Sequence, residues 1–192
     1  MALFIVGLVV FLGAHSTRLV ADGWRSAQLA RLGPGPWKGL YSLVSIAGFV
    51  ALIWGYGLAR QTTQVLWVPP QWTKHVAALM MLASFVLLVA AYAPRNAIKA
   101  RLHHPMLLAV QLWAFAHLMA NGTLVDLLLF GAFLAWGVAD FRSSRARDAA
   151  AGTVYPPGTT AGTATTVVAG IVAWGVFAFW LHGPLIGVRP FG

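Results

Sequence analysis

The chain contains no cysteine. Disulfide bonds, thiolate ligation of a haem iron and thiol catalysis are therefore all excluded. Charged residues are also scarce, at 9% of the 192 residues, whereas an ordinary soluble domain carries about 25%. Hydrophobic residues make up 59% of the chain. A sequence with so little charge cannot cover a water-exposed surface, and its composition predicts that lipid surrounds the protein.

Several patterns that carry chemistry in other proteins are missing as well. No carboxylates are paired within one apolar run, because Asp126 and Asp140 fall near opposite ends of the same run and Asp148 follows it. Proton-relay and carboxylate–metal functions therefore have little support. No glycine-rich phosphate loop follows a predicted strand. The net charge of +9 does not indicate nucleic-acid binding, since the basic residues form short clusters between apolar runs.

Six apolar runs predict an all-α integral membrane bundle of about six transmembrane helices. Each run is about long enough to cross roughly 30 Å of hydrocarbon at 1.5 Å per residue. The turn sequence at 121–123 is expected to join the fourth and fifth helices as an antiparallel hairpin, because their summed length is too great for one bent helix. The predicted helices cover 2–20, 39–59, 75–93, 105–121, 124–141 and 165–183.

Lysine and arginine are distributed unevenly between the loops. Ten of them follow the first, third and fifth helices, and three lie on the other side. Because basic loops stay in the cytoplasm, both termini are expected outside it. The N-terminal run lacks a preceding basic region and a convincing cleavage site, so it is interpreted as a retained helix.

The chain is interpreted as a single transmembrane domain over 1–192. Between the fifth and sixth helices, glycine, proline and small polar residues are frequent. Such a composition has little apolar surface to bury, and it predicts a flexible cytoplasmic linker near 142–164.

Histidines are the main candidates for chemistry, because an ionisable group inside a bilayer is costly unless it is paired. His15 and His117 lie within the first and fourth predicted helices, and neither has an acidic residue within one helical turn. A neutral imidazole there can satisfy its N–H on one neighbour and keep its other nitrogen for a metal. The other four lie at or near helix ends, where interfacial solvation explains them: His75, His103, His104 and His182.

The residues around this pair suit a flat apolar cofactor. At helical spacing, Arg18 shares a face with His15, while Trp113 and Ala114 share a face with His117. Two histidines on different helices, with apolar walls and an arginine to meet a propionate, form the arrangement that b-type haem needs. A structural role also fits, in which each ring bonds a carbonyl of a neighbouring helix, so both interpretations stay open.

Several stretches resemble the NnrU family of bacterial membrane proteins, which is related to the 15-cis-zeta-carotene isomerase of plants and cyanobacteria. The resemblance covers most of the chain in the family's order. It implies a multi-pass protein of the bacterial inner membrane and a link to nitrite and nitric oxide metabolism in denitrification, and with the charge count above both termini are predicted to be periplasmic. The matching stretches are GAHSTRL, RLGPGPWKGLYSLVSIAGFVALIWGYG, NAIKARLHHPMLLAVQLWAFAHLMANG, LLLFGAFLAWGVADFRSSR and HGPLIGVRPF.

The related isomerase binds haem b through two histidines. Carried onto the matching segments, the resemblance implies that His15 and His117 are the iron ligands. A cysteine that is proposed to exchange as a ligand in the isomerase corresponds to Ala114 here, which counts against ligand exchange and carotenoid isomerisation. His104 is the fallback partner of His15, because His117 is expected about 8–10 Å nearer the outer surface.

Three functions stay open from the sequence. The first is a haem-b protein of nitrite and nitric oxide metabolism with a redox or gas-binding role. The second is a haem-dependent cis–trans isomerase of a carotenoid or another lipidic polyene. The third is a structural or permease-like membrane protein without haem. The expected partners are the lipid bilayer and either nitric oxide or a lipidic small molecule. Whether the chain also forms a homo-oligomer stays open.

Overall fold

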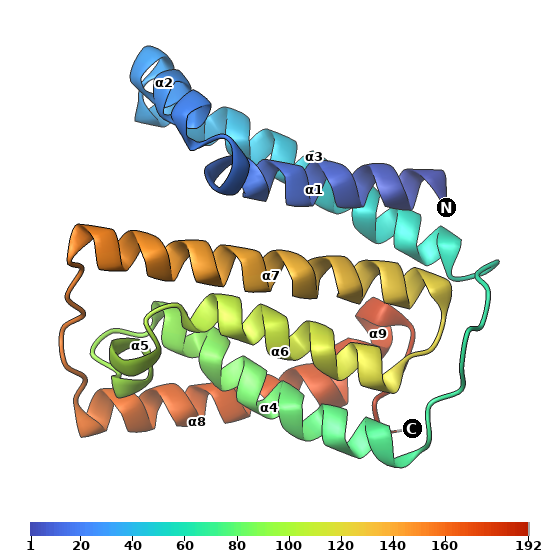
Figure 1. Cartoon of the computed structure of the whole chain (residues 1–192). Helices are drawn as coiled ribbons and strands as arrows, with labels where there is room; N and C mark the ends of the chain where they lie inside the picture. The colour runs from blue at the N-terminus through green and yellow to red at the C-terminus, as the bar shows by residue number, and fades with distance from the viewer. Residues whose placement is uncertain (192) are drawn as a thin grey trace. The chain divides into compact units, whose positions relative to one another are not determined.

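The computed structural model describes residues 1–191, and helices account for most of them (Figure 1). The chain divides into two compact units. Unit 1 contains Met1–Trp67 and Thr123–Ala132, and unit 2 contains Val68–Gly122 and Phe133–Gly192. Because the boundary falls within one long helix, that helix contributes its first turns to unit 1 and the remainder to unit 2.

Five helices of the described chain are long and apolar enough to cross a membrane. A sixth, the 16-residue α6 (Pro105–Ala120), is apolar but shorter than the predicted span at 105–121. The all-helical membrane architecture is thus confirmed, with one short member. The five long helices are α1 (Ala2–Val20), α3 (Pro34–Ala59), α4 (Trp72–Tyr92), α7 (Leu124–Ala151) and Thr160–Ile186, which joins α8 (Thr160–Val176), the π-helical turn η1 (Phe177–Leu181) and α9 (His182–Ile186).

The long helices expose apolar side chains. Only 11% to 28% of the residues in their apolar windows are buried within the protein. Val9, Leu43 and Leu79, for example, are 65%, 65% and 68% exposed. Contact of such a large apolar surface with water is unfavourable, whereas lipid chains can cover it. The helices satisfy their own backbone hydrogen bonds, as a membrane requires. The chain is therefore a multi-pass membrane protein.

Unit 1 is built on the close contact of α1 with α3, and glycine makes that contact possible. A Cβ added at Gly7 would lie 2.6 Å from the Cα of Leu52, and one added at Gly48 would lie 2.8 Å from the backbone nitrogen of Phe11. Gly7 contacts Leu52 and Phe11 contacts Gly48, so residue numbers rise along α1 as they fall along α3. The two helices are therefore antiparallel. α2 (Asp22–Leu32) connects them.

Unit 2 packs its helices in antiparallel neighbours. Ser84 on α4 donates to the carbonyl of Ala109 on α6 at 2.8 Å. Gln111 on α6 donates to the carbonyl of Gly137 on α7 at 3.0 Å. α8 lies against α4 so closely that a Cβ at Gly170 would be 2.6 Å from the Cα of Val86. The hairpin predicted between the fourth and fifth helices is present.

Several helix boundaries differ from the predicted ones. α7 continues to Ala151 and α8 begins at Thr160, so the segment between them is 152–159 and not 142–164. The extra turns of α7 are charged, and hydropathy marks where the apolar part of a helix ends and not where the helix itself ends. α2 and the six-residue α5 (Ala97–Leu102) were not predicted, because neither contains an apolar run long enough to span a membrane.

Candidate functional site

His15 lies on α1 in unit 1, between two aromatic rings. Its Nδ1 is 2.7 Å from the carbonyl oxygen of Phe11, one turn earlier on the same helix. Since a carbonyl only accepts, Nδ1 carries a proton and donates this hydrogen bond. The ring centroid is 4.3 Å from that of Phe11 and 5.4 Å from that of Tyr41 on α3.

His117 on α6 in unit 2 repeats this arrangement. Its Nδ1 is 2.8 Å from the carbonyl oxygen of Trp113, again four residues earlier. Nδ1 therefore carries a proton and donates the hydrogen bond here also. The indole of Trp113 lies 5.5 Å from the His117 ring and 5.4 Å, edge-on, from that of Phe133.

The same hydrogen bond thus fixes the same tautomer in two separate units. Metal-bound histidines commonly donate their second nitrogen to a carbonyl, which orients the ring and makes the ligating nitrogen more basic. The sequence allowed each ring to bond a neighbouring helix, but the Nδ1 bond goes to the ring's own helix in both cases. Both histidine rings are therefore oriented by the backbone of their own helix.

The other residues proposed for a cofactor site differ in exposure. Arg18 is exposed in the last turn of α1, where its guanidinium is accessible to an anion. Trp113 is half-buried against His117. Ala114 is fully buried, so its surface is already covered and is not an open wall of the kind that helical spacing indicated.

The described residues offer few donors for a bare metal ion. Within residues 1–191, no group of three or more His, Asp or Glu side chains is placed to hold a metal. Haem supplies four nitrogen ligands of its own and takes its axial ligands from the protein. Imidazole side chains fit that requirement.

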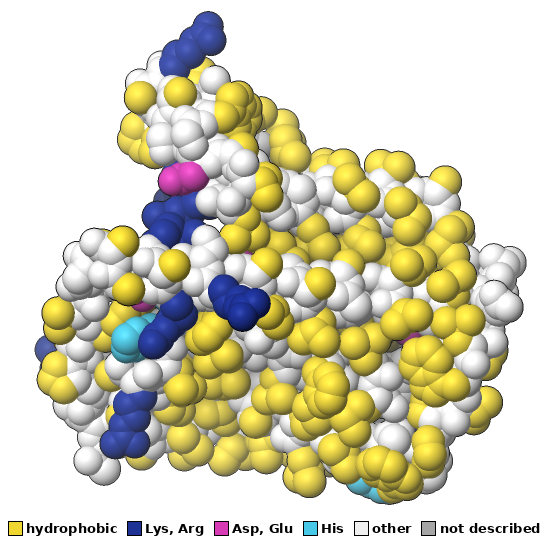
Figure 2. Space-filling model, viewed as in Figure 1, with side chains coloured by type: hydrophobic (Ala, Val, Ile, Leu, Met, Phe, Trp, Pro, Cys, Tyr) yellow, Lys and Arg dark blue, Asp and Glu magenta, His cyan; other side chains and the backbone are white. Residues whose placement is uncertain are grey.

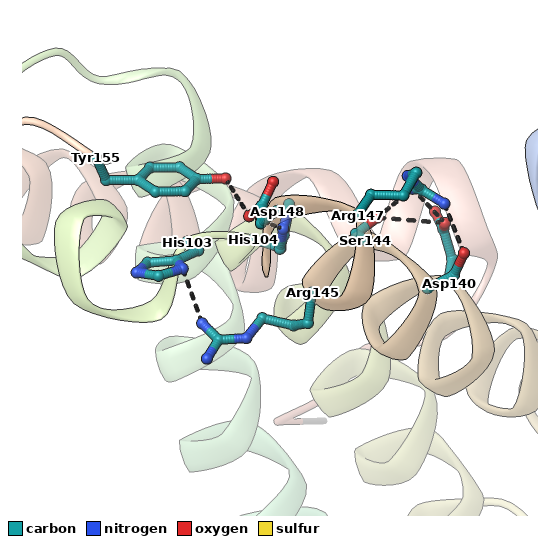
Figure 3. Close-up of polar contacts among 9 residues, drawn as sticks. His103, His104, Asp140, Ser144, Arg145, Arg147, Asp148 and Tyr155 are labelled. Atoms are coloured by element: carbon teal, nitrogen blue, oxygen red, sulfur yellow. Dashed lines mark hydrogen bonds and ion pairs between the residues drawn. The ribbon is translucent and has the colours of Figure 1, made fainter. Parts of the chain in front are cut away.

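A second polar cluster lies in unit 2, where α6 begins and α7 ends (Figure 3). His104 Nε2 is 2.8 Å from Asp148 Oδ2, and the Tyr155 hydroxyl donates to the same oxygen at 2.9 Å. Arg145 donates to Nδ1 of His103 at 2.8 Å, and the His103 ring stacks on Tyr155 with centroids 4.3 Å apart. We call these five residues the histidine–arginine cluster.

The cluster affects the ionisation of Tyr155, which lies between α7 and α8. Burial raises the pKa of its hydroxyl, and the hydrogen bond to Asp148 and the charge of that carboxylate raise it further. The neutral phenol is therefore the stable form in the fold. Next to the cluster, Arg147 bonds Ser144 at 2.6 Å and contacts Asp140 at 3.5 Å, so Asp140 also has a cationic partner.

This cluster changes the standing of His104 as a fallback iron ligand. Its Nε2 already bonds a carboxylate, whereas the Nδ1 bonds of His15 and His117 go to backbone carbonyls. The sequence analysis assigned His103 and His104 to interfacial solvation and placed Asp148 in a loop. It missed the cluster because the paired residues are more than 40 positions apart and Asp148 lies on the charged end of α7.

A buried carboxylate lies at the start of α7 in unit 1. Asp126 is 6% exposed and accepts from the Tyr56 hydroxyl and from the Thr123 hydroxyl, each at 2.6 Å. Thr123 also accepts from the backbone nitrogen of Asp126 at 3.3 Å. The Thr123 hydroxyl thus accepts from the first turn of α7 while it donates to the Asp126 carboxylate, and with Tyr56 these bonds give Asp126 a structural role at the helix start.

The fold first defines the class: the chain is a multi-pass α-helical membrane protein with two tautomer-fixed histidines on apolar helices. The profile of one family, described as NnrU protein, matches residues 3–190. Because the match spans nearly the whole chain, the protein belongs to the NnrU family, as the resemblance indicated. No curated protein and no solved structure matches the chain significantly.

Proposed function

We propose that the protein binds haem b, whose iron His15 and His117 would hold, and serves nitrite and nitric oxide metabolism through a redox or gas-binding role. The observation that supports this is the repeated hydrogen bond from Nδ1 to the carbonyl four residues earlier, at 2.7 Å and 2.8 Å. Bound haem would supply an iron that changes oxidation state and binds diatomic gases.

The chain's own residues have defined tasks under this proposal. The carbonyls of Phe11 and Trp113 hold the Nδ1 protons and keep both rings in one tautomer. The aromatic rings beside each histidine make its surroundings more apolar, which affects the redox potential of an iron centre. Arg18, exposed at the end of α1, is the cation offered to a propionate.

An absorbance spectrum tests the proposal directly. Purified protein, produced with haem supplementation, should show a Soret band and the α and β bands of a low-spin b-type haem when reduced. His15→Ala and His117→Ala should each remove the low-spin spectrum, because each deletes one ligand of the iron. His75→Ala is a matched control, because His75 lies near the start of α4, and it should leave the spectrum unchanged.

Two outcomes would separate the alternatives. A protein that folds but shows no Soret band after haem supplementation would be a structural membrane protein, in which the Nδ1 bonds only satisfy two half-buried rings. Isomerisation of a lipidic polyene is the alternative use of the same haem. Feeding a poly-cis carotene to cells that make the protein, and separating the isomers by chromatography, would detect that activity.

We also propose that the protein lies in the bacterial inner membrane with its termini on the periplasmic side. The support is the count of ten lysines and arginines on one set of loops against three on the other. Alkaline phosphatase fused to either terminus should be active, and a fluorescent protein that folds only in the cytoplasm should be dark there. The reverse result at both termini would invert the topology.

A further inference from the structure

One end of unit 2 gathers the polar segments that enter and leave its apolar helices. The backbone nitrogen of Thr159, before α8, donates to the carbonyl of Arg95, after α4, at 2.8 Å. Ala97 at the start of α5 donates to the Thr163 hydroxyl at 2.9 Å. The bond from His104 to Asp148 brings α6 and α7 to the same place. The apolar helices all extend from this polar end in the same direction. We therefore place this end at the depth of the lipid headgroups.

This end is also strongly basic. Segments 93–104 and 140–159 contain six basic residues and two aspartates. The two aspartates already have partners in His104 and Arg147, and they can offset only two of the six positive charges. An excess of positive charge therefore remains at this end. Figure 2 shows dark blue basic side chains beside a histidine at the α5 end of this unit. The basic residues are Arg95, Lys99, Arg101, Arg142, Arg145 and Arg147.

The backbone at His103 is strained. Its φ of 67° and ψ of −54°, with a 2.8 Å hydrogen bond from the nitrogen of His104 to the carbonyl of Leu102, define a γ-turn of the rare positive-φ kind. Glycine adopts a positive φ without steric cost, whereas a histidine does not. Non-glycine residues held this way cluster at sites where a side chain must be presented in one position.

The hydrogen bonds settle which nitrogen of His103 can donate. Arg145 donates to Nδ1, so Nδ1 carries the lone pair and Nε2 carries the proton. Figure 3 shows this second nitrogen turned away from Arg145. Arg145 is exposed and has further N–H groups beyond the one that it gives to His103. The pair thus presents several donors and a positive charge.

The geometry points to a phosphate-ester site formed by Arg145 and His103 at this membrane-facing end. Guanidinium groups bind phosphate through paired, charge-assisted hydrogen bonds, and Nε2–H of His103 adds a neutral donor. Apolar side chains flank the site, since Leu102 and Met106 are 39% and 42% exposed. The site therefore suits the headgroup of an anionic phospholipid, whose acyl chains would lie along the helices. It does not involve His15, His117 or haem.

Native mass spectrometry of the full-length protein in detergent tests the site. The protein is offered equal amounts of phosphatidylglycerol and phosphatidylcholine, and the retained lipids are counted. Wild-type protein should retain phosphatidylglycerol preferentially. Arg145→Gln should reduce its retention about tenfold or more, the effect of losing a charge-assisted hydrogen bond to the phosphate. His103→Gly keeps the turn and deletes the ring, and it should reduce retention in the same direction.

Arg142→Gln is the matched control, because it removes the same charge from an exposed position three residues earlier on α7. It should leave retention near the wild-type value. Equal losses with Arg142→Gln and Arg145→Gln would show diffuse charge attraction and overturn the proposal, as would a wild-type protein with no preference for phosphatidylglycerol. Circular dichroism confirms folding, and if one of the two test variants is unfolded the other decides.

Inorganic phosphate distinguishes the two sources of the ligand. Millimolar phosphate that displaces phosphatidylglycerol from wild-type protein, but not the residual lipid of Arg145→Gln, would support the site with a soluble phosphate as occupant. Retention that withstands phosphate would support it with the lipid headgroup as occupant.

Discussion

A Cβ added at Gly55 on α3 would lie 2.6 Å from the Cα of Phe4 on α1, against ordinary contacts of 3.4–4 Å. The neighbouring atoms are backbone, so no side chain can rotate away. Gly55→Ala would therefore push α1 and α3 apart by about 1 Å, and gaps of 0.5–1 Å forfeit roughly a quarter to a half of each dispersion contact. Overpacking of this kind costs about 1–3 kcal/mol.

Gly57→Ala provides the control, because a Cβ at Gly57 has nothing within 4 Å. In an open helical position, alanine is roughly 0.5–1 kcal/mol better than glycine. Both variants gain this helix propensity, so their free energies of unfolding should differ by the overpacking cost of about 1–3 kcal/mol, with Gly55→Ala the less stable. Unfolding in detergent micelles by titration with sodium dodecyl sulfate, followed by far-ultraviolet circular dichroism, measures both. Equal stabilities would refute the inferred contact between α1 and α3.

Three further predictions use the same unfolding assay. Asn96→Ala should lower the free energy of unfolding by about 2–4 kcal/mol, because the buried amide caps α5 and donates to two carbonyls. Thr159→Ala, which loses one exposed helix cap, should lower it by about 1 kcal/mol. Asp126→Ala should destabilise the protein by roughly 1–3 kcal/mol, by leaving two hydroxyl donors without their acceptor. Tyr155 has a raised pKa, so its contribution to stability is complete below its ordinary pKa of about 10 and is lost as the pH rises through the higher folded value. Tyr155→Phe should remove that alkaline loss, and an unchanged pH profile would count against the hydrogen bond to Asp148.

The apolar runs predicted most of the fold because lipid-facing helices are apolar on all sides. The first run predicted 2–20, and α1 covers Ala2–Val20. The second helix was predicted to begin at 39, but α3 begins at Pro34. Proline fits the first turn of a helix, because the N–H that it lacks would have no partner there. Polar helical segments such as α5 carry no apolar run, and propensity alone does not reveal them.

The candidate sites were predictable to different degrees. His15 and His117 stood out in the sequence because an imidazole within an apolar run is rare. Their Nδ1 bonds follow from helix geometry, in which a side chain can reach the carbonyl one turn earlier. The contact of Arg145 with His103 is a tertiary contact over 42 positions, and the strained turn at His103 leaves no pattern in the sequence.

The length of α6 has a consequence for the membrane around it. Its 16 residues rise about 24 Å, roughly 6 Å less than a typical hydrocarbon layer. Phe115 and Met106, which are 48% and 42% exposed, show that part of this helix faces outward. A bilayer adapts to such hydrophobic mismatch by thinning locally. His117 lies in the last turn of α6, so a thinned bilayer would bring water, protons and small polar solutes within a few ångströms of that imidazole.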